Sequence, residues 1–445
     1  MRRQKRHNKY GASTVFMAII LSALVIVETV FLTLVSDMNR RMELSRALKC
    51  QAESILAGYD RDLFRVYGIY AFGPDKLNDE VFCKVLAANS AKDLPALECT
   101  GTEALDDYAL RKAIISYYSY RTVGMLAKES MKQLSGLAGG LESSGLLAKI
   151  KEYRSSGAAG YLSDILSGAV DIEGVLSTAG ESYDLSGLNK FVELLDDCKD
   201  DVTSYDGGFD LFDMASVTDL AGTLEKMTAD IGDGLFSAID HVLIAHYAAF
   251  NFDCVIDNKT DKTITGTSFT RIHGKDYCDS EYIMTGSGGK TGSFTVSTLI
   301  FATLFAKEFL SNYTDSNARA RYKVIAVVLS VVIGLLSAGT VIIQPDILET
   351  VIIVIVSICG AAKSLKELKK GGTVSFIEKD GVEFIKLGYR DFMFLFTLFT
   401  PDSALLPRML EVLGRDYGEL YTGIKLETEY GGTGYDITKS YVMYE

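Results

Sequence analysis

A cationic arm followed by a long apolar run at the N-terminus constrains this chain more than any other feature. The run covers residues 12–35 and contains one ionisable side chain, Glu28. Because a transmembrane helix needs about 20 mostly apolar residues, this run is long enough to cross a bilayer. Basic flanks stay in the cytoplasm, so we predict a single-pass signal-anchor with the bulk of the chain outside. The cations of the arm are Arg2, Arg3, Lys5, Arg6 and Lys9.

Glu28 lies in the outer half of the predicted span. A carboxylate at such a depth is costly unless it reaches the interface, is protonated or meets a partner. Two interpretations stay open: an interfacial carboxylate near the outer headgroups, or a contact with a helix of another subunit. Glu28 is therefore our candidate for an intramembrane partner-helix contact.

The predicted helix does not stop at the membrane. Residues 36–59 contain neither Gly nor Pro before Gly58, and their apolar residues recur at helical spacing. We expect one continuous helix from the membrane into the body, an arrangement typical of pilin-like proteins.

Short motifs occur near both ends of the chain and at one interior point. They are residues 11–16 (GASTVF), 46–48 (RAL), 52–63 (AESILAGYDRDL), 67–72 (YGIYAF), 281–286 (EYIMTG), 387–392 (LGYRDF) and 408–410 (RML). Together they resemble an uncharacterised Gram-positive family encoded among tight-adherence (Flp-type) pilus and type II secretion-like components, similar to minor pseudopilins of the TadE/TadG kind. The resemblance implies other pilus or secretion subunits as partners, reached through the N-terminal helix. Pilin-type precursors usually carry Glu five positions after the processed Gly; Phe16 stands there relative to Gly11, so we expect the anchor to be retained.

The charge balance and the histidine content exclude several function classes. The net charge is −13 despite the basic arm, and an acidic body repels phosphate backbones, so we predict no nucleic-acid partner. Four histidines leave little from which to build a relay or a metal site. His241 and His246 stand five apart rather than four, and residues 286–291 (GSGGKT) miss the Walker pattern because Met284 replaces a Gly. We predict a non-catalytic protein without metal or cofactor.

The seven cysteines show no metal-ligand spacing. Cys83 with Cys99, and Cys254 with Cys278, are close enough in sequence to form local disulfides in an oxidising compartment. Scattered buried thiols are the alternative that the sequence favours.

The remaining pattern predicts an α+β protein that is mainly α. We expect a helical entry (36–72), a mainly helical body (73–252) with a Gly-rich break near residues 136–140, and a segment with a β-hairpin and a helix (253–322). Residues 323–370 hold two apolar runs, which we interpret as a buried or membrane-associated helical hairpin; two further spans are the alternative. The last part (371–445) is α+β, with hairpins around residues 380–381 and 431–432 that together build one small sheet.

These expectations favour a structural component of a pilus or type II-like secretion apparatus, anchored in the cell membrane. The alternative is an independent surface module that binds cell-wall polymer or a host ligand.

Overall fold

The computed structural model describes residues 9–77, 98–118, 124–203, 205, 211–212, 214–229, 239–256, 278–379, 382–430 and 432–442. The chain forms two compact units: residues 1–113 with 413–445 make unit 1, and residues 114–412 make unit 2. The chain passes between the units within α4 (Asp107–Tyr118) and α17 (Asp402–Tyr417). Unit 1 is therefore built from both ends of the sequence.

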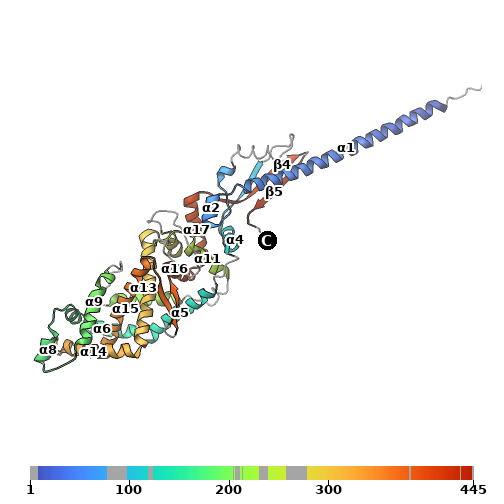
Figure 1. The fold of residues 1–445 in the computed structure, drawn as a ribbon. Helices are drawn as coiled ribbons and strands as arrows, with labels where there is room; N and C mark the ends of the chain where they lie inside the picture. The colour runs from blue at the N-terminus through green and yellow to red at the C-terminus, as the bar shows by residue number, and fades with distance from the viewer. Residues whose placement is uncertain are drawn as a thin grey trace, which may run out of the picture. The chain divides into compact units, whose positions relative to one another are not determined.

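Unit 1 is organised around one long helix. It contains α1 (Lys9–Leu56), α2 (Arg61–Tyr67), η1 (Pro74–Leu77), β1 (Glu98–Ala104), β4 (Tyr421–Tyr430) and β5 (Thr433–Ser440). Figure 1 shows α1 as a single uninterrupted helix. A short turn ends it, and Asp60 then caps α2 by accepting the N–H groups of Asp62 and Leu63 at 2.9 Å.

The three strands of unit 1 form an antiparallel sheet in the order β1-β4-β5. The β4–β5 register is regular, with Leu426 opposite Ile437 and Tyr430 opposite Thr433. Gly432 has φ 76°, so the tight turn uses the residue that adopts this backbone without strain. Alternation along β4 turns Ile424 and Leu426 toward the core of the unit.

Unit 2 is a helical body with one small hairpin. Its helices are α5 (Gly124–Ser143), α6 (Leu146–Ser156), α7 (Ala159–Leu166), α8 (Ile172–Thr178), α9 (Ser186–Thr203), α10 (Ala215–Ala229), α11 (Ile239–Phe250), α12 (Asp279–Thr285), α13 (Gly289–Thr314), α14 (Ser316–Leu336), α15 (Pro345–Lys369) and α16 (Tyr389–Thr397). Its strands are β2 (Val374–Lys379) and β3 (Val382–Leu387). The core runs along α13 and α15, where Phe301, Phe305, Ile352 and Ile355 have no exposed surface.

The structure confirms a mainly helical α+β fold with small antiparallel strands. It also confirms both predicted hairpins, but they belong to separate sheets rather than to one. The apolar runs at 324–343 and 350–362 do form a helical hairpin, α14 and α15. The most apolar window of α15 is 78% buried within the protein, because α9, α13 and α14 pack around it. This burial supports the interpretation of a hairpin inside the body.

Other expectations are corrected. A strand hairpin was predicted within residues 254–282; its last residues are helical, in α12 (Asp279–Thr285), and the hairpin otherwise stays a prediction because residues 257–277 lie outside the described residues. The expected break near 136–140 is absent, since α5 continues through these glycines to Ser143. The sequence was divided into consecutive segments, whereas unit 1 combines residues 1–113 with residues 413–445. The difference arises because strand pairing is a long-range contact that no local pattern encodes.

Candidate functional site

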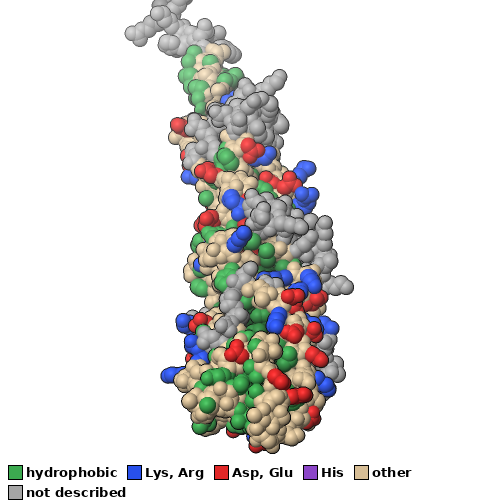
Figure 2. All heavy atoms as spheres, turned by 90° about the vertical axis from the view of Figure 1, so that its left-hand side faces the viewer, with side chains coloured by type: hydrophobic (Ala, Val, Ile, Leu, Met, Phe, Trp, Pro, Cys, Tyr) green, Lys and Arg blue, Asp and Glu red, His purple; other side chains and the backbone are tan. Residues whose placement is uncertain are grey.

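The N-terminal half of α1 is an exposed apolar surface. The helix is long and apolar enough to cross a membrane, and none of its most apolar window is buried. Figure 2 shows apolar side chains on the part of this helix that is visible there. Its polar side chains are adapted to such surroundings: the hydroxyls of Ser22, Thr29 and Thr33 donate to backbone carbonyls of the same helix at 2.7–2.9 Å.

Glu28 differs from these hydroxyl residues. Its side chain is exposed on α1, and no described residue forms an ion pair or hydrogen bond with it. A carboxylate cannot satisfy itself on its own helix as a hydroxyl does, so in lipid it needs a partner from elsewhere or a proton. The structure thus places the candidate residue on a surface that another helix can reach.

The C-terminal half of α1 is part of the core of unit 1. Leu44, Leu48, Ala52 and Ile55 are buried and pack with Phe72, Ile424 and Leu426 in one apolar cluster. Each position lies three or four residues after the previous one, so all four share one face of the helix. The exposed apolar half of α1 is therefore fixed to the sheet by its own continuation rather than by a linker.

Polar contacts add to the apolar packing between the C-terminal half of α1 and the sheet. The Tyr441 hydroxyl donates to the carbonyl of Leu56, and Lys439 forms an ion pair with Glu53 at 3.6 Å. Burial raises the pKa of the Tyr441 hydroxyl above its ordinary value. The last strand and the last turn of α1 are thereby joined.

The interior and C-terminal motifs noted in the sequence meet in unit 2. Glu281 is fully buried and accepts the N–H of Val255 at 3.0 Å and the hydroxyl of Tyr389 at 3.3 Å. Ser280 donates its N–H to the carbonyl of Asp253 at 2.8 Å. Burial raises the pKa of the Glu281 carboxyl. Burial also raises the pKa of the Tyr389 phenol.

Two arginines of these motifs satisfy the ends of helices. The Arg390 guanidinium is 1% exposed and donates to the carbonyls of Ala249 at 2.6 Å and Phe252 at 3.0 Å, where α11 ends. Arg408 donates in the same way to the carbonyls of Ile283 and Met284, at the end of α12. Helix ends leave carbonyls without partners, and a cation suits this pole of the helix dipole. The chemistry offered is structural: these side chains hold α11, α12, α16 and α17 together.

The two histidines singled out in the sequence contact different partners. His241 approaches Asp402 Oδ1 with Nδ1 at 2.7 Å and the Leu398 carbonyl with Nε2 at 2.9 Å. With Asp402 ionised, both contacts are hydrogen bonds only when the ring carries two N–H groups. His246 lies within 3.1 Å of the Tyr118 hydroxyl. Among the described residues, no group of three or more His, Cys, Asp or Glu side chains is placed to hold a metal ion.

The cysteines pair differently from the sequence expectation. Cys198 on α9 and Cys359 on α15 form a disulfide across 161 residues, a pairing that sequence proximity does not suggest. Cys254 and Cys278 are buried thiols, so the bridge considered for them is not formed. Cys83 lies outside the described residues, so the Cys83–Cys99 pairing stays a prediction.

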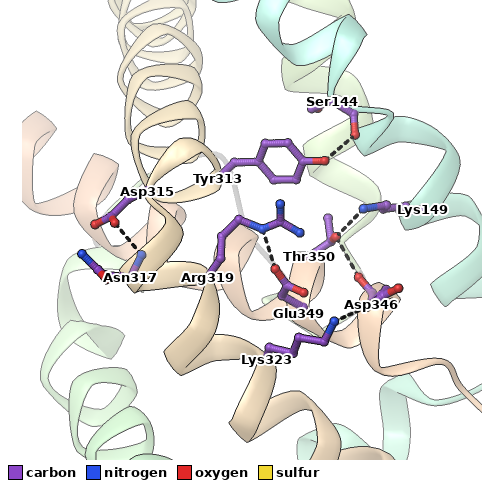
Figure 3. Close-up of polar contacts among 10 residues, drawn as sticks. All are labelled: Ser144, Lys149, Tyr313, Asp315, Asn317, Arg319, Lys323, Asp346, Glu349 and Thr350. Atoms are coloured by element: carbon purple, nitrogen blue, oxygen red, sulfur yellow. Dashed lines mark hydrogen bonds and ion pairs between the residues drawn. The ribbon is translucent and has the colours of Figure 1, made fainter.

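A polar cluster fixes the N-terminal end of α15 against its neighbours (Figure 3). Arg319 of α14 contacts the buried Glu349 at 2.7 Å, and Lys323 contacts Asp346 at 3.4 Å. Lys149 of α6 donates to the Thr350 hydroxyl at 3.2 Å. Both Lys149 and Arg319 also lie over the ring of Tyr313. The cluster joins α6, α13, α14 and α15.

The comparisons with known proteins add no assignment: the chain matches no protein-family model, no curated protein and no solved structure. The functional argument therefore depends on the geometry of α1 and of the two units. Sequence reasoning found α1 and Glu28. It missed the packing of the C-terminal half of α1 against β4 and β5, and it missed the Cys198–Cys359 disulfide. The alternation of Ile424 and Leu426 signalled a buried strand face without indicating what covers it.

Proposed function

We propose that this protein is a non-catalytic, membrane-anchored extracytoplasmic component of a pilus or type II-like secretion apparatus. The observation that carries the proposal is the division of α1 into two halves. The first half has no buried surface in its apolar window, whereas the second half is core of unit 1. A rigid helix that leaves its own fold with an apolar surface supplies both an anchor and a surface for neighbouring helices in the membrane.

Two features support an N-terminus inside and a body outside. Five cations precede the apolar run, and such flanks remain cytoplasmic. The body holds a disulfide between Cys198 and Cys359, and disulfides persist in oxidising, extracytoplasmic surroundings. The burial of α15 within unit 2 agrees with a single span, formed by α1.

The first test is topological. Protease added to intact protoplasts should degrade unit 2 and the part of unit 1 that follows residue 35, and leave a membrane-protected fragment that contains residues 12–35. A fragment of unit 2 that survives until the membrane is permeabilised would contradict the proposal.

The second test addresses assembly through Glu28. Glu28→Leu should leave the protein in the membrane fraction but reduce its crosslinking to other subunits, because the carboxylate no longer has to be satisfied by a partner helix. Ile26→Leu is the matched control, since it changes a neighbouring side chain without altering charge. Unchanged native complexes in Glu28→Leu membranes, seen by native electrophoresis after mild solubilisation, would remove Glu28 from the proposal.

A further inference from the structure

A groove runs between α9 and α14 in unit 2. Both helices pack on α15 and make few contacts with each other, so α15 forms the floor of the space between them. The cavity has a volume of about 440 Å³. Its walls and floor include the apolar side chains of Leu188, Phe191, Leu194, Val324, Val328 and Val356.

The walls of this groove have the geometry of a helix-packing surface. Leu188, Phe191 and Leu194 recur every three residues on α9, and Val324 and Val328 stand four apart on α14, so each set follows one ridge of its helix. Leu194 is 40% exposed and Val324 is 57% exposed. Apolar side chains gather between charged ones in the lower part of Figure 2, where α8, α9 and α14 face the viewer. The helices α9 and α14 thus form a layer on α15, and the groove is the space between them.

The charges at the groove are cationic in an acidic chain. Lys190 and Arg321 line the groove together with one carboxylate, Asp184, while the whole chain has a net charge of −13. Neither cation makes a hydrogen bond or an ion pair within 4.0 Å with any residue that the structure describes. The Asp184 carboxylate accepts the N–H of Ser186 at 2.9 Å.

The neighbours of Arg321 on α14 show that its position is distinct. Arg319 and Lys323 stand four residues apart, so they share one face of the helix. Both use that face to pair with acidic residues of α15, Glu349 and Asp346. Arg321 lies between them in sequence and lines the groove instead. The acidic residues of α15 thus neutralise the cations on one face of α14 and leave the cation of the groove available.

We propose that this groove is a docking site for an amphipathic helix of a partner protein, with apolar side chains facing α9 and α14 and carboxylates facing Lys190 and Arg321. A helix laid between α9 and α14 extends the existing layer on α15 by the same side-chain packing. The two cations select an acidic partner and fix its register. This inference does not depend on the proposed function.

The test uses the full chain in phosphatidylcholine nanodiscs and two designed, fluorescein-labelled helical peptides of about 18 residues. Both peptides carry Leu on one face; one has Glu beside that face and its twin has Lys. The Glu peptide should bind saturably in fluorescence anisotropy, with empty nanodiscs as background. Lys190→Glu with Arg321→Glu should weaken that binding by about tenfold or more and should strengthen binding of the Lys twin.

Two further variants make the result specific. Lys151→Glu with Lys290→Glu changes the net charge by the same amount at exposed positions outside the groove and should leave both affinities unchanged. Leu194→Asp should abolish binding of both peptides while the circular dichroism spectrum and melting temperature stay near those of the parent.

Several outcomes would overturn the proposal. They are equal binding of the two peptides, an equal loss in the Lys151/Lys290 variant, or no saturable binding above empty nanodiscs. Concentration-dependent self-association that Leu194→Asp removes would assign the groove to a second copy of this chain instead. Displacement of the Glu peptide by oleate at equal concentration would assign it to an anionic acyl chain.

Discussion

Arg390 is a buried cation, 1% exposed, that supplies hydrogen-bond donors to backbone carbonyls inside unit 2. Its guanidinium donates to the carbonyls of Ala249 and Phe252, and its charge lies close enough to Glu281 to oppose the burial effect on that carboxyl. A buried cation is tolerated only when its donors and its charge are both matched. Here helix-end carbonyls and one carboxyl provide that match.

Arg390→Ala should therefore destabilise unit 2 strongly. Removal takes the Arg390 donor from the Ala249 carbonyl and leaves the Phe252 carbonyl with the Ser280 hydroxyl at 3.0 Å. The expected loss in free energy of unfolding is about 3 kcal/mol. Urea unfolding of the detergent-solubilised protein, followed by circular dichroism, measures it. Arg154→Ala on the exposed face of α6 is the control and should cost roughly 0.5 kcal/mol or less. Similar losses in free energy of unfolding for the two variants would show that the Arg390 hydrogen bonds do not stabilise unit 2.

Glu281 gives unit 2 a pH dependence of defined sign. Burial raises its folded-state pKa, so the folded state holds the proton more tightly than the unfolded state. Its contribution is complete below the unfolded value of about 4.3 and declines as pH rises through the raised folded value.

Glu281→Gln should remove this dependence while keeping an acceptor for Val255 and Tyr389. We expect the variant to become more stable relative to the parent, that is, its free energy of unfolding should rise relative to that of the parent, as the pH increases above about 4.3. Chemical denaturation at a series of pH values gives the two curves. Parallel curves would mean that the carboxyl does not titrate abnormally.

At the scale of elements, α1 is one helix with two different environments. Its first half has surface suited to lipid and to other helices, and its second half packs on β4 and β5. The continuity of the helix matters because a bend or linker at residue 36 would uncouple the anchor from the fold. Nothing in residues 36–56 breaks a helix, since they contain neither Gly nor Pro.

Leu48→Ala tests the packing of α1 against β4 and β5. Leu48 is 2% exposed in the apolar cluster, and the cavity left by truncation should cost about 2–5 kcal/mol. Limited proteolysis should then cut β4 and β5 sooner, with the anchor still in the membrane. Met42→Ala is the matched control on the same helix, because Met42 is 53% exposed. Equal protease resistance of the parent and Leu48→Ala would argue against this packing of α1 on the sheet.

At the scale of the whole molecule, contacts distant in sequence define both units. Unit 1 joins the first part of the chain to residues 413–445, and the disulfide of unit 2 spans 161 residues. The disulfide restricts the unfolded chain, and the long-range contacts of both units must close long loops as the chain folds. The disulfide also links folding to the compartment in which the body resides.

Cys198→Ser should lower the stability of unit 2 by roughly 2–5 kcal/mol, because the lost bridge closes a long loop. Treatment of the parent with a reductant should have the same effect on the melting temperature, whereas Cys50→Ser, an exposed thiol on α1, should have none. Alkylation of native membranes followed by peptide mass spectrometry reports the bridge directly. Full alkylation of Cys198 and Cys359 before reduction would contradict the disulfide and remove its support for an extracytoplasmic body.

The sequence by itself determined the long apolar helix at the N-terminus, the helical character of most of the body and the hairpins β2–β3 and β4–β5, because apolar runs, helical periodicity and Gly-containing turns are local signals. Only the tertiary structure decided which parts meet. Glu281 contacts Tyr389 across 108 residues, Ile424 and Leu426 find α1, and Cys198 finds Cys359. These pairings depend on the burial of complementary surfaces far apart in the chain, and a local pattern can show that a face is apolar without showing what covers it.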